Sequence, residues 1–207
     1  MIKNNLLPRE RMTPEEFEIF MKMLDYEEKY FADMMFKTRE LESYLRIKMQ
    51  GEDGNWHDVQ EDLPGWKNVD LSLWTIRLKK RMGIAAGRCL GKKKIIEIKK
   101  TNDNNSLKYT LIHEMIHAYE EMLFDRYRQL LCFYFKKKLF AQGLTERKFK
   151  KLLELDEFLA RANSHTVFHS VLFMLKALSL DRRLRVSEGT IHGYGREEHY
   201  KKKGEDE

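Results

Sequence analysis

Apolar side chains recur every three or four positions near the start of the chain, from Phe17 through Phe31 and on to Leu45. This spacing is typical of a helix with one apolar face. Thr13 precedes the pattern as a helix N-cap, Pro14 suits the first helical position, and two glutamates fill the first turn. We therefore expect a helical segment here that packs its apolar face on a core.

The pattern changes from helical spacing to alternation after residues 50–66, whose three glycines, proline and acidic residues predict a loop. Residues 69–74 alternate between apolar and polar and predict a strand. Residues 83–91 and 94–100 are two further strand-like segments separated by a short Gly-Lys turn, which predicts a hairpin. Together these segments indicate a small three-stranded sheet.

Helical spacing returns in the second half of the chain. The pattern predicts one helix at about 107–124, another through 130–140, a break at Gly143, and a helical stretch capped by Thr145 with an interruption near Asn163. The order is therefore helix, small sheet, then further helices. This order predicts an α+β fold that is mostly helical, rather than an alternating α/β fold.

Composition narrows the class of protein. The chain has 207 residues, 42% hydrophobic and 12% aromatic, which suffices for a core and excludes a disordered chain. Cys89 and Cys132 lie far apart and form no CxxC pair, which excludes a Cys-rich zinc ribbon and argues against a disulfide framework. There is neither a bilayer-spanning apolar run nor a signal-peptide pattern, so we expect an intracellular protein, nuclear or cytoplasmic.

Formal charge is unevenly distributed along the chain. Residues 1–62 carry 9 Lys and Arg against 15 Asp and Glu, whereas the remaining residues carry 30 against 18. An acidic N-terminal segment followed by a basic remainder of the chain favours a polyanionic partner. The alternative is that the lysines only keep helices solvated, because charge alone carries no geometry.

The sequence HEMIH at 113–117 is the main candidate for chemistry. On a helix, positions i and i+4 share a face, so His113 and His117 can each offer a nitrogen to one ion about 2 Å away. Glu114 can reach a water on the open position of that ion and take its proton, which is the chemistry of metal-assisted amide hydrolysis. The alternative is two partly buried structural histidines beside an exposed glutamate.

Such a site needs a third ligand from elsewhere in the chain. His165 and His169 are again four apart and fall on the apolar stripe of a predicted helix, so we expect both to face inward. Glu154 or Glu157 could instead supply a carboxylate, as in a His₂Glu site. The alternative for each histidine is that it only packs against the core.

Three stretches resemble the SprT-like metallopeptidase family, which includes the Spartan-type DNA–protein crosslink proteases. They are LPGWKNVDLSLWTIRL at 63–78, AAGRC at 85–89 and LKYTLIHEMIHAYEEM at 107–122. The first is similar to the family's Trp-Ser-x-Arg strand, the second to its Ala-Gly-x-Cys strand, and the third to its metal helix. Their order and spacing agree with the family over roughly residues 63–124.

The resemblance implies Zn²⁺ held by His113 and His117, with Glu114 as the catalytic base and the small sheet packed on the metal helix in a zincin-like fold. It also implies a third histidine in a His-Gly-x-x-Phe-like motif. In SHTVFH at 164–169, His165 takes the ligand place, a threonine stands where glycine is usual, and His169 stands near the phenylalanine position. We therefore expect His165 as the third ligand and His169 as the second choice.

In this chain 47 residues separate the HExxH motif from His165. The corresponding gap in the family is much shorter. This difference predicts an inserted helical hairpin at about 124–160. The expected organisation is an acidic helical segment packed on the core (1–62), a SprT-like metallopeptidase core that contains the insertion (63–186), and a flexible basic tail (187–207).

The resulting prediction is a zinc metallopeptidase that cleaves DNA-associated or DNA-crosslinked proteins, with single-stranded or junction-containing DNA as a second partner and no membrane. Basic side chains around the sheet would contact DNA phosphates. The indole of Trp74 could stack on a base, or it could instead be a core residue. The alternatives are a non-catalytic DNA-binding or scaffold protein with the same fold and a general peptidase without nucleic-acid dependence. The candidate DNA-contacting residues are Arg77, Lys79, Lys80, Arg81, Arg88 and Trp74.

Overall fold

The structure is a computed structural model that describes residues 11–35, 70–162 and 169–193. These residues form five helices and a three-stranded sheet, which confirms the predicted α+β fold. The chain divides into two compact units, Met1–Phe124 and Asp125–Glu207.

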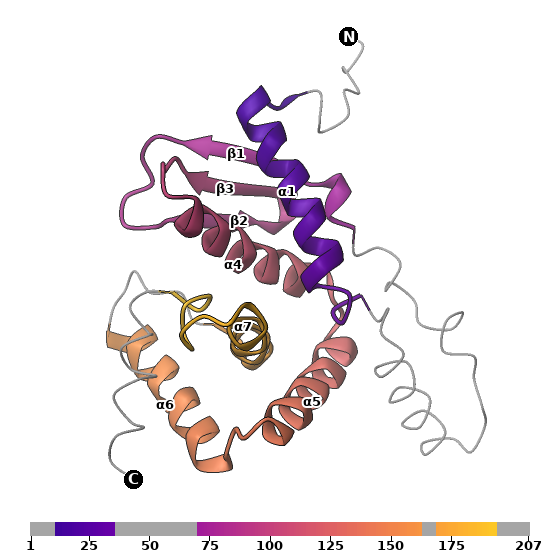
Figure 1. Cartoon of the computed structure of the whole chain (residues 1–207), viewed down its shortest axis with the longest axis vertical. Coiled ribbons are helices and arrows are strands. Elements are labelled where there is room, and N and C mark those ends of the chain that lie inside the picture. Colours follow the sequence, from indigo (N-terminus) through magenta and orange to yellow (C-terminus); the bar gives the residue numbers. More distant parts are fainter. Residues whose placement is uncertain (1–10, 36–69, 163–168, 194–207) are drawn as a thin grey trace, which may run out of the picture. The chain divides into compact units, whose positions relative to one another are not determined.

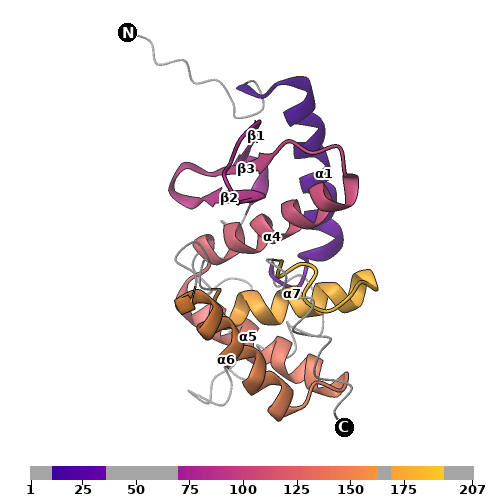
Figure 2. The same ribbon diagram turned by 90° about the vertical axis from the view of Figure 1, so that its left-hand side faces the viewer.

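The first unit is built around a mixed sheet. Its strands are β1 (Thr75–Lys79), β2 (Gly87–Leu90) and β3 (Ile95–Lys99), in the order β1-β3-β2. β3 pairs in parallel with β1 and antiparallel with β2, so the predicted hairpin is confirmed. Helix α4 (Asn104–Met122) packs on β2 and β3, while α1 (Pro14–Tyr30) packs on β1 and α4 (Figures 1 and 2).

The predicted strand at 69–74 is wrong within the described residues. Leu71–Leu73 is a 3-10 turn, η3, and the first strand starts only at Thr75. The cause is local, because the side chain of Asp70 accepts a hydrogen bond from the N–H of Ser72 (2.8 Å) and folds the backbone into a turn. Burial follows the turn and not the alternation, since Leu71 and Trp74 are buried whereas Leu73, which shares a strand face with Leu71 in the predicted pattern, is exposed.

Helix α1 begins where the sequence predicts and is fixed to the sheet by its first turn. Thr13 and Glu16 form a capping box, with the Thr13 N–H donating to Oε2 of Glu16 (2.9 Å). The same carboxylate accepts from the N–H of Leu78 in β1 (3.0 Å) and pairs with Arg77 (3.1 Å). One buried glutamate therefore caps the helix and attaches it to the strand.

Helix α4 is anchored at its C-terminal end by two buried rings. The hydroxyl of Tyr119 donates to Oε1 of Glu27 on α1 (2.6 Å), and its ring stacks on Phe31 at 4.9 Å between centroids. The indole N–H of Trp74 donates to Sδ of Met122 (3.3 Å). These contacts hold the helix that carries the HExxH motif against α1 and the chain leading into β1.

The second unit contains α5 (Asp125–Ala141), α6 (Glu146–Ala162) and α7 (Val171–Leu184), with α5 packed on α7. The predicted break at Gly143 is confirmed, because its φ of 91° is a left-handed conformation that favours glycine. Helices α5 and α6 occupy the stretch where we expect an inserted hairpin; that they are an insertion stays a prediction.

Residues 187–193, which the sequence assigns to a flexible tail, fold back after α7 and bury Ile191 and His192. The physical reason is the carboxylate of Asp181, which accepts hydrogen bonds from the N–H groups of Gly189 (2.7 Å) and Ile191 (2.9 Å).

Within the described residues, we find no helix with the length and apolar character needed to cross a membrane.

Candidate metal centre

Helix α4 places His113 and His117 one turn apart on the same face, as the motif predicts. Their ring centroids lie 5.0 Å apart with an interplanar angle of 71°. His113 is buried and His117 is half-buried. Nδ1 of His117 lies 3.7 Å from Oε2 of Glu120, one turn further along the same helix.

Glu114 is buried beneath strand β2, not exposed as the structural alternative supposes. Its carboxylate accepts the backbone N–H of Cys89. Position 87 must be glycine here, because a Cβ at Gly87 would lie 2.5 Å from Oε1 of Glu114 and 2.8 Å from Cγ2 of Thr110. The strand backbone therefore passes directly over the carboxylate and limits its movement.

Burial raises the pKa of Glu114 to about 7, although His117, the N–H of Cys89 and Arg88 act in the opposite direction. A carboxyl group that titrates near neutral pH can accept a proton and return it within one reaction cycle. The site thus provides a group with the properties of a general base directly next to one of the candidate metal-binding histidines.

His169 is buried immediately before Ser170, the residue that caps α7. Its ring packs on Phe173 with 4.3 Å between centroids. Nδ1 of His169 lies 3.3 Å from Nε2 of His192, and the two rings are nearly perpendicular at 88°. The backbone before α7 and the turn after it therefore bring two buried histidines together.

His113, His117 and His169 could together hold a metal ion. Each offers one ring nitrogen as a ligand. Three imidazoles are a donor set that suits zinc and leaves a further position open for water or substrate.

The other predicted ligands have different outcomes. His165 lies outside the described residues and stays a prediction, whereas His169, the second choice, is in the histidine group. The side chain of Glu154 is exposed and lies 4.0 Å from Lys150, so it is not part of that group. The side chain of Glu157 lies outside the part of the chain that the structure describes.

The candidate DNA-contacting residues separate by exposure. Trp74 is fully buried, so its ring is a core residue and cannot stack on a base here. Arg77 is bonded to Glu16 and to the carbonyl of Arg11, and Lys79 lies 3.1 Å from Glu97. Lys80 and Arg81, which follow β1, and Arg88, which lies within β2, are exposed, as is Lys79.

Sequence reasoning missed the contributions of Gly87 and His192. Gly87 falls inside a stretch already matched to a strand, but its closeness to Glu114 depends on how strand and helix pack. His192 lies in a glycine-rich stretch, GTIHGYG, whose composition predicts a frayed C-terminal tail. His192 directly follows Ile191, whose N–H is bound by the buried carboxylate of Asp181, and this placement has no signature along the chain.

Residues 59–130 match the model of the SprT-like family. This match confirms the resemblance for that part of the chain, which includes the whole sheet and helix α4. The segment is therefore SprT-like, and it carries the HExxH motif of a metallopeptidase-like domain. The comparisons with curated proteins and with solved structures gave no match.

Proposed function

We propose that this protein is a zinc-dependent metallopeptidase in which His113, His117 and His169 hold the metal and Glu114 is the general base. The observation that carries the proposal is the geometry of α4, where the ring centroids of His113 and His117 lie 5.0 Å apart beside the buried side chain of Glu114. The SprT-like match over residues 59–130 supports peptide hydrolysis as the reaction.

Zinc bound to these residues would supply Lewis acidity toward a water molecule and a peptide carbonyl. Glu114 would take the proton from the attacking water and return it to the leaving amine. The N–H of Cys89 would orient the carboxylate during both transfers. In the metal-free chain burial raises the pKa of Glu114 to about 7, which is the direction that favours holding a proton between the two transfers.

The test compares two variants of helix α4. Glu114→Gln should lower cleavage of casein or histone by at least about a hundredfold while keeping the zinc content of the wild type. Glu121→Gln is the matched control, because Glu121 is exposed on the same helix and should leave both quantities unchanged. Full activity in Glu114→Gln would refute the assigned role.

A separate variant tests the third ligand. His169→Ala should lose zinc, as measured by metal analysis of the purified protein.

We also propose that the substrates are proteins bound or crosslinked to DNA. Support comes from the resemblance to Spartan-type proteases, from the basic charge of residues 63–207, and from the exposed side chains of Lys80, Arg81 and Arg88. Phosphate contacts by such residues would give salt-dependent binding without sequence preference.

Cleavage measured with and without single-stranded DNA tests this second proposal. We expect DNA to stimulate turnover, and the triple variant Lys80→Ala, Arg81→Ala, Arg88→Ala to weaken binding and to reduce its salt dependence. DNA-independent turnover would point to a general peptidase. A wild type that binds zinc stoichiometrically and binds DNA but cleaves nothing would instead favour the scaffold function.

A further inference from the structure

Two buried histidines face each other at the start of α7. Nε2 of His192 lies 3.3 Å from Nδ1 of His169, and both side chains are almost completely buried, at 2% and 3% exposure. A neutral imidazole has one N–H and one acceptor nitrogen, so a hydrogen bond between two such rings is donated by one and accepted by the other. The direction of this bond decides which nitrogen of His169 carries the proton.

The direction matters because a metal binds only a ring nitrogen that carries no proton. Nδ1 of His169 is turned toward His192, so Nε2 is the nitrogen that this ring can offer to an ion. For that, the proton must be on Nδ1 and must be donated to Nε2 of His192. The opposite direction would place the proton of His169 on Nε2 and block the ligand position.

We propose that His192 is a positioning residue that accepts the Nδ1–H of His169 and thereby presents Nε2 of His169 to the metal. The inference rests on the proposed function, since it concerns the third ligand of that site. Metal-binding histidines commonly donate their second N–H to such a partner, which fixes both tautomer and ring orientation.

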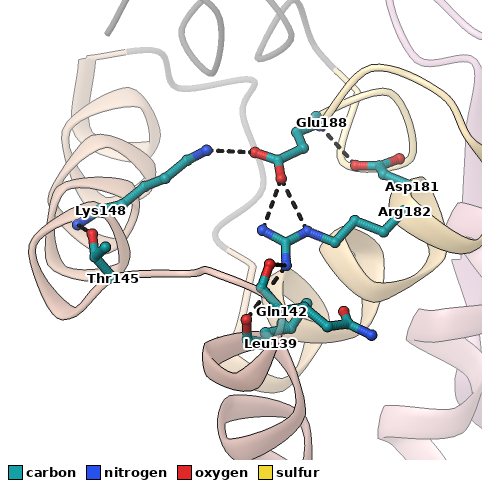
Figure 3. A network of polar contacts seen from close by, with 8 residues as sticks. Leu139, Gln142, Thr145, Lys148, Asp181, Arg182 and Glu188 are labelled. Carbon is teal, nitrogen blue, oxygen red and sulfur yellow. Dashed lines mark hydrogen bonds and ion pairs between the residues drawn. The ribbon is translucent and has the colours of Figure 1, made fainter. Parts of the chain in front are cut away.

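The turn that carries His192 is fixed by two acidic residues. Asp181, completely buried on α7, accepts the N–H groups of Gly189 (2.7 Å) and Ile191 (2.9 Å). Glu188 is held between Lys148 (2.7 Å) and Arg182 (3.0 Å), as Figure 3 shows. Bonds on either side of Gly189 therefore restrict the backbone that leads into His192.

Packing fixes the orientation of the two rings as well. Phe173, one turn into α7, lies 4.3 Å from the ring of His169 and 5.6 Å from that of His192, measured between centroids. Since Phe173 is fully buried, neither imidazole can rotate without disturbing the core around it. Nε2 of His192 is thus held where an acceptor is needed.

The first test measures zinc affinity by competition with a chromophoric chelator. His192→Phe keeps an aromatic ring but removes the acceptor, and we expect its affinity for zinc to fall by about 10- to 100-fold. His192→Gln places an amide oxygen near the position of Nε2 and should retain most of the affinity. Thermal unfolding of both zinc-free variants should stay close to that of the zinc-free wild type, which separates positioning from general stability.

The outcomes distinguish this inference from the function on which it rests. If the wild type binds no stoichiometric zinc, or His169→Ala binds it equally well, the proposed metal site fails. If His169→Ala loses zinc but His192→Phe binds as tightly as the wild type, only the role of His192 fails.

A second measurement uses the wild type and does not depend on how the variants fold. Two-bond ¹H–¹⁵N correlation spectra of the zinc-loaded protein report which nitrogen of each histidine is protonated. We expect His169 to be protonated on Nδ1 and His192 to be unprotonated on Nε2. Zinc on Nδ1 of His169, or a proton on Nε2 of His192, would overturn the inference.

Discussion

Glu114 lies where strand β2 leaves no room for a side chain at position 87. We expect Gly87→Ala to displace the carboxylate, because its new Cβ would lie 2.5 Å from Oε1 and 2.7 Å from Cγ of Glu114. Overpacking of this kind costs about 1–3 kcal/mol of stability. The variant should therefore unfold at a lower temperature and lose most peptidase activity.

The neighbouring position supplies the control for this substitution. Ala86 is exposed beside Gly87, so Ala86→Ser adds an atom of similar size toward solvent and should change neither quantity. Equal activity in Gly87→Ala and wild type would show that Glu114 is not confined by the strand.

Cys89 is next to the same carboxylate and is made unreactive mainly by burial. Burial, with the charges of Glu114, Glu121 and Glu120, raises the pKa of the Cys89 thiol to about 12. Because the thiolate is the reactive form, alkylation by iodoacetamide at pH 8 should be at least about a hundredfold slower than in the unfolded chain. Mass spectrometry of a Cys132→Ser variant measures this rate for Cys89 alone; rapid labelling of the folded protein would contradict the expectation.

Glu16 acts at the level of the elements, since it joins α1 to β1. Burial alone would raise its pKa, but the N–H groups of Thr13 and Leu78 and the charge of Arg77 outweigh burial and hold the pKa below its usual value of 4.5. A carboxyl group whose pKa is lower in the folded than in the unfolded state stabilises the fold at neutral pH. This stabilisation is lost as the pH falls through the lowered pKa.

We therefore expect Glu16→Gln to lower the free energy of unfolding by about 1–3 kcal/mol at pH 7. The difference from wild type should shrink as the pH falls below about 4.5, which denaturant titrations at several pH values would measure. Glu18→Gln is the matched control, because Glu18 is exposed on the same helix and pairs only with Lys22 among the contacts described for it. A pH-independent difference for Glu16→Gln would contradict the role of its charge.

The elements differ in how well the sequence predicts them, and the range of their contacts explains why. Helix α1 was predictable because the Thr13 cap and the helical spacing act within a few residues. The strand at 69–74 failed because one side-chain bond of Asp70 outweighs an alternating pattern. The HExxH face is likewise local to α4. The turn that buries His192 is not, since it depends on the carboxylate of Asp181 on the preceding helix.

The proposed metal ligands come from distant parts of the sequence, since His113 and His117 lie on α4 whereas His169 precedes α7. A metal that binds all three can bind only the folded chain, because the unfolded chain does not bring them together. Zinc affinity therefore adds directly to the stability of the whole molecule.

The expected size of this effect follows from mass action. With free zinc at a hundred times its Kd, a ligand that binds only the folded state stabilises it by about 2.7 kcal/mol. Thermal unfolding of the wild type should shift upward with zinc and back after chelation. His169→Ala should show a much smaller shift, whatever its stability without metal, because two imidazoles on one helix bind weakly and do not depend on α7. An unfolding temperature of the wild type that does not respond to zinc would mean that these histidines do not act together on one ion, and the peptidase proposal would lose its basis.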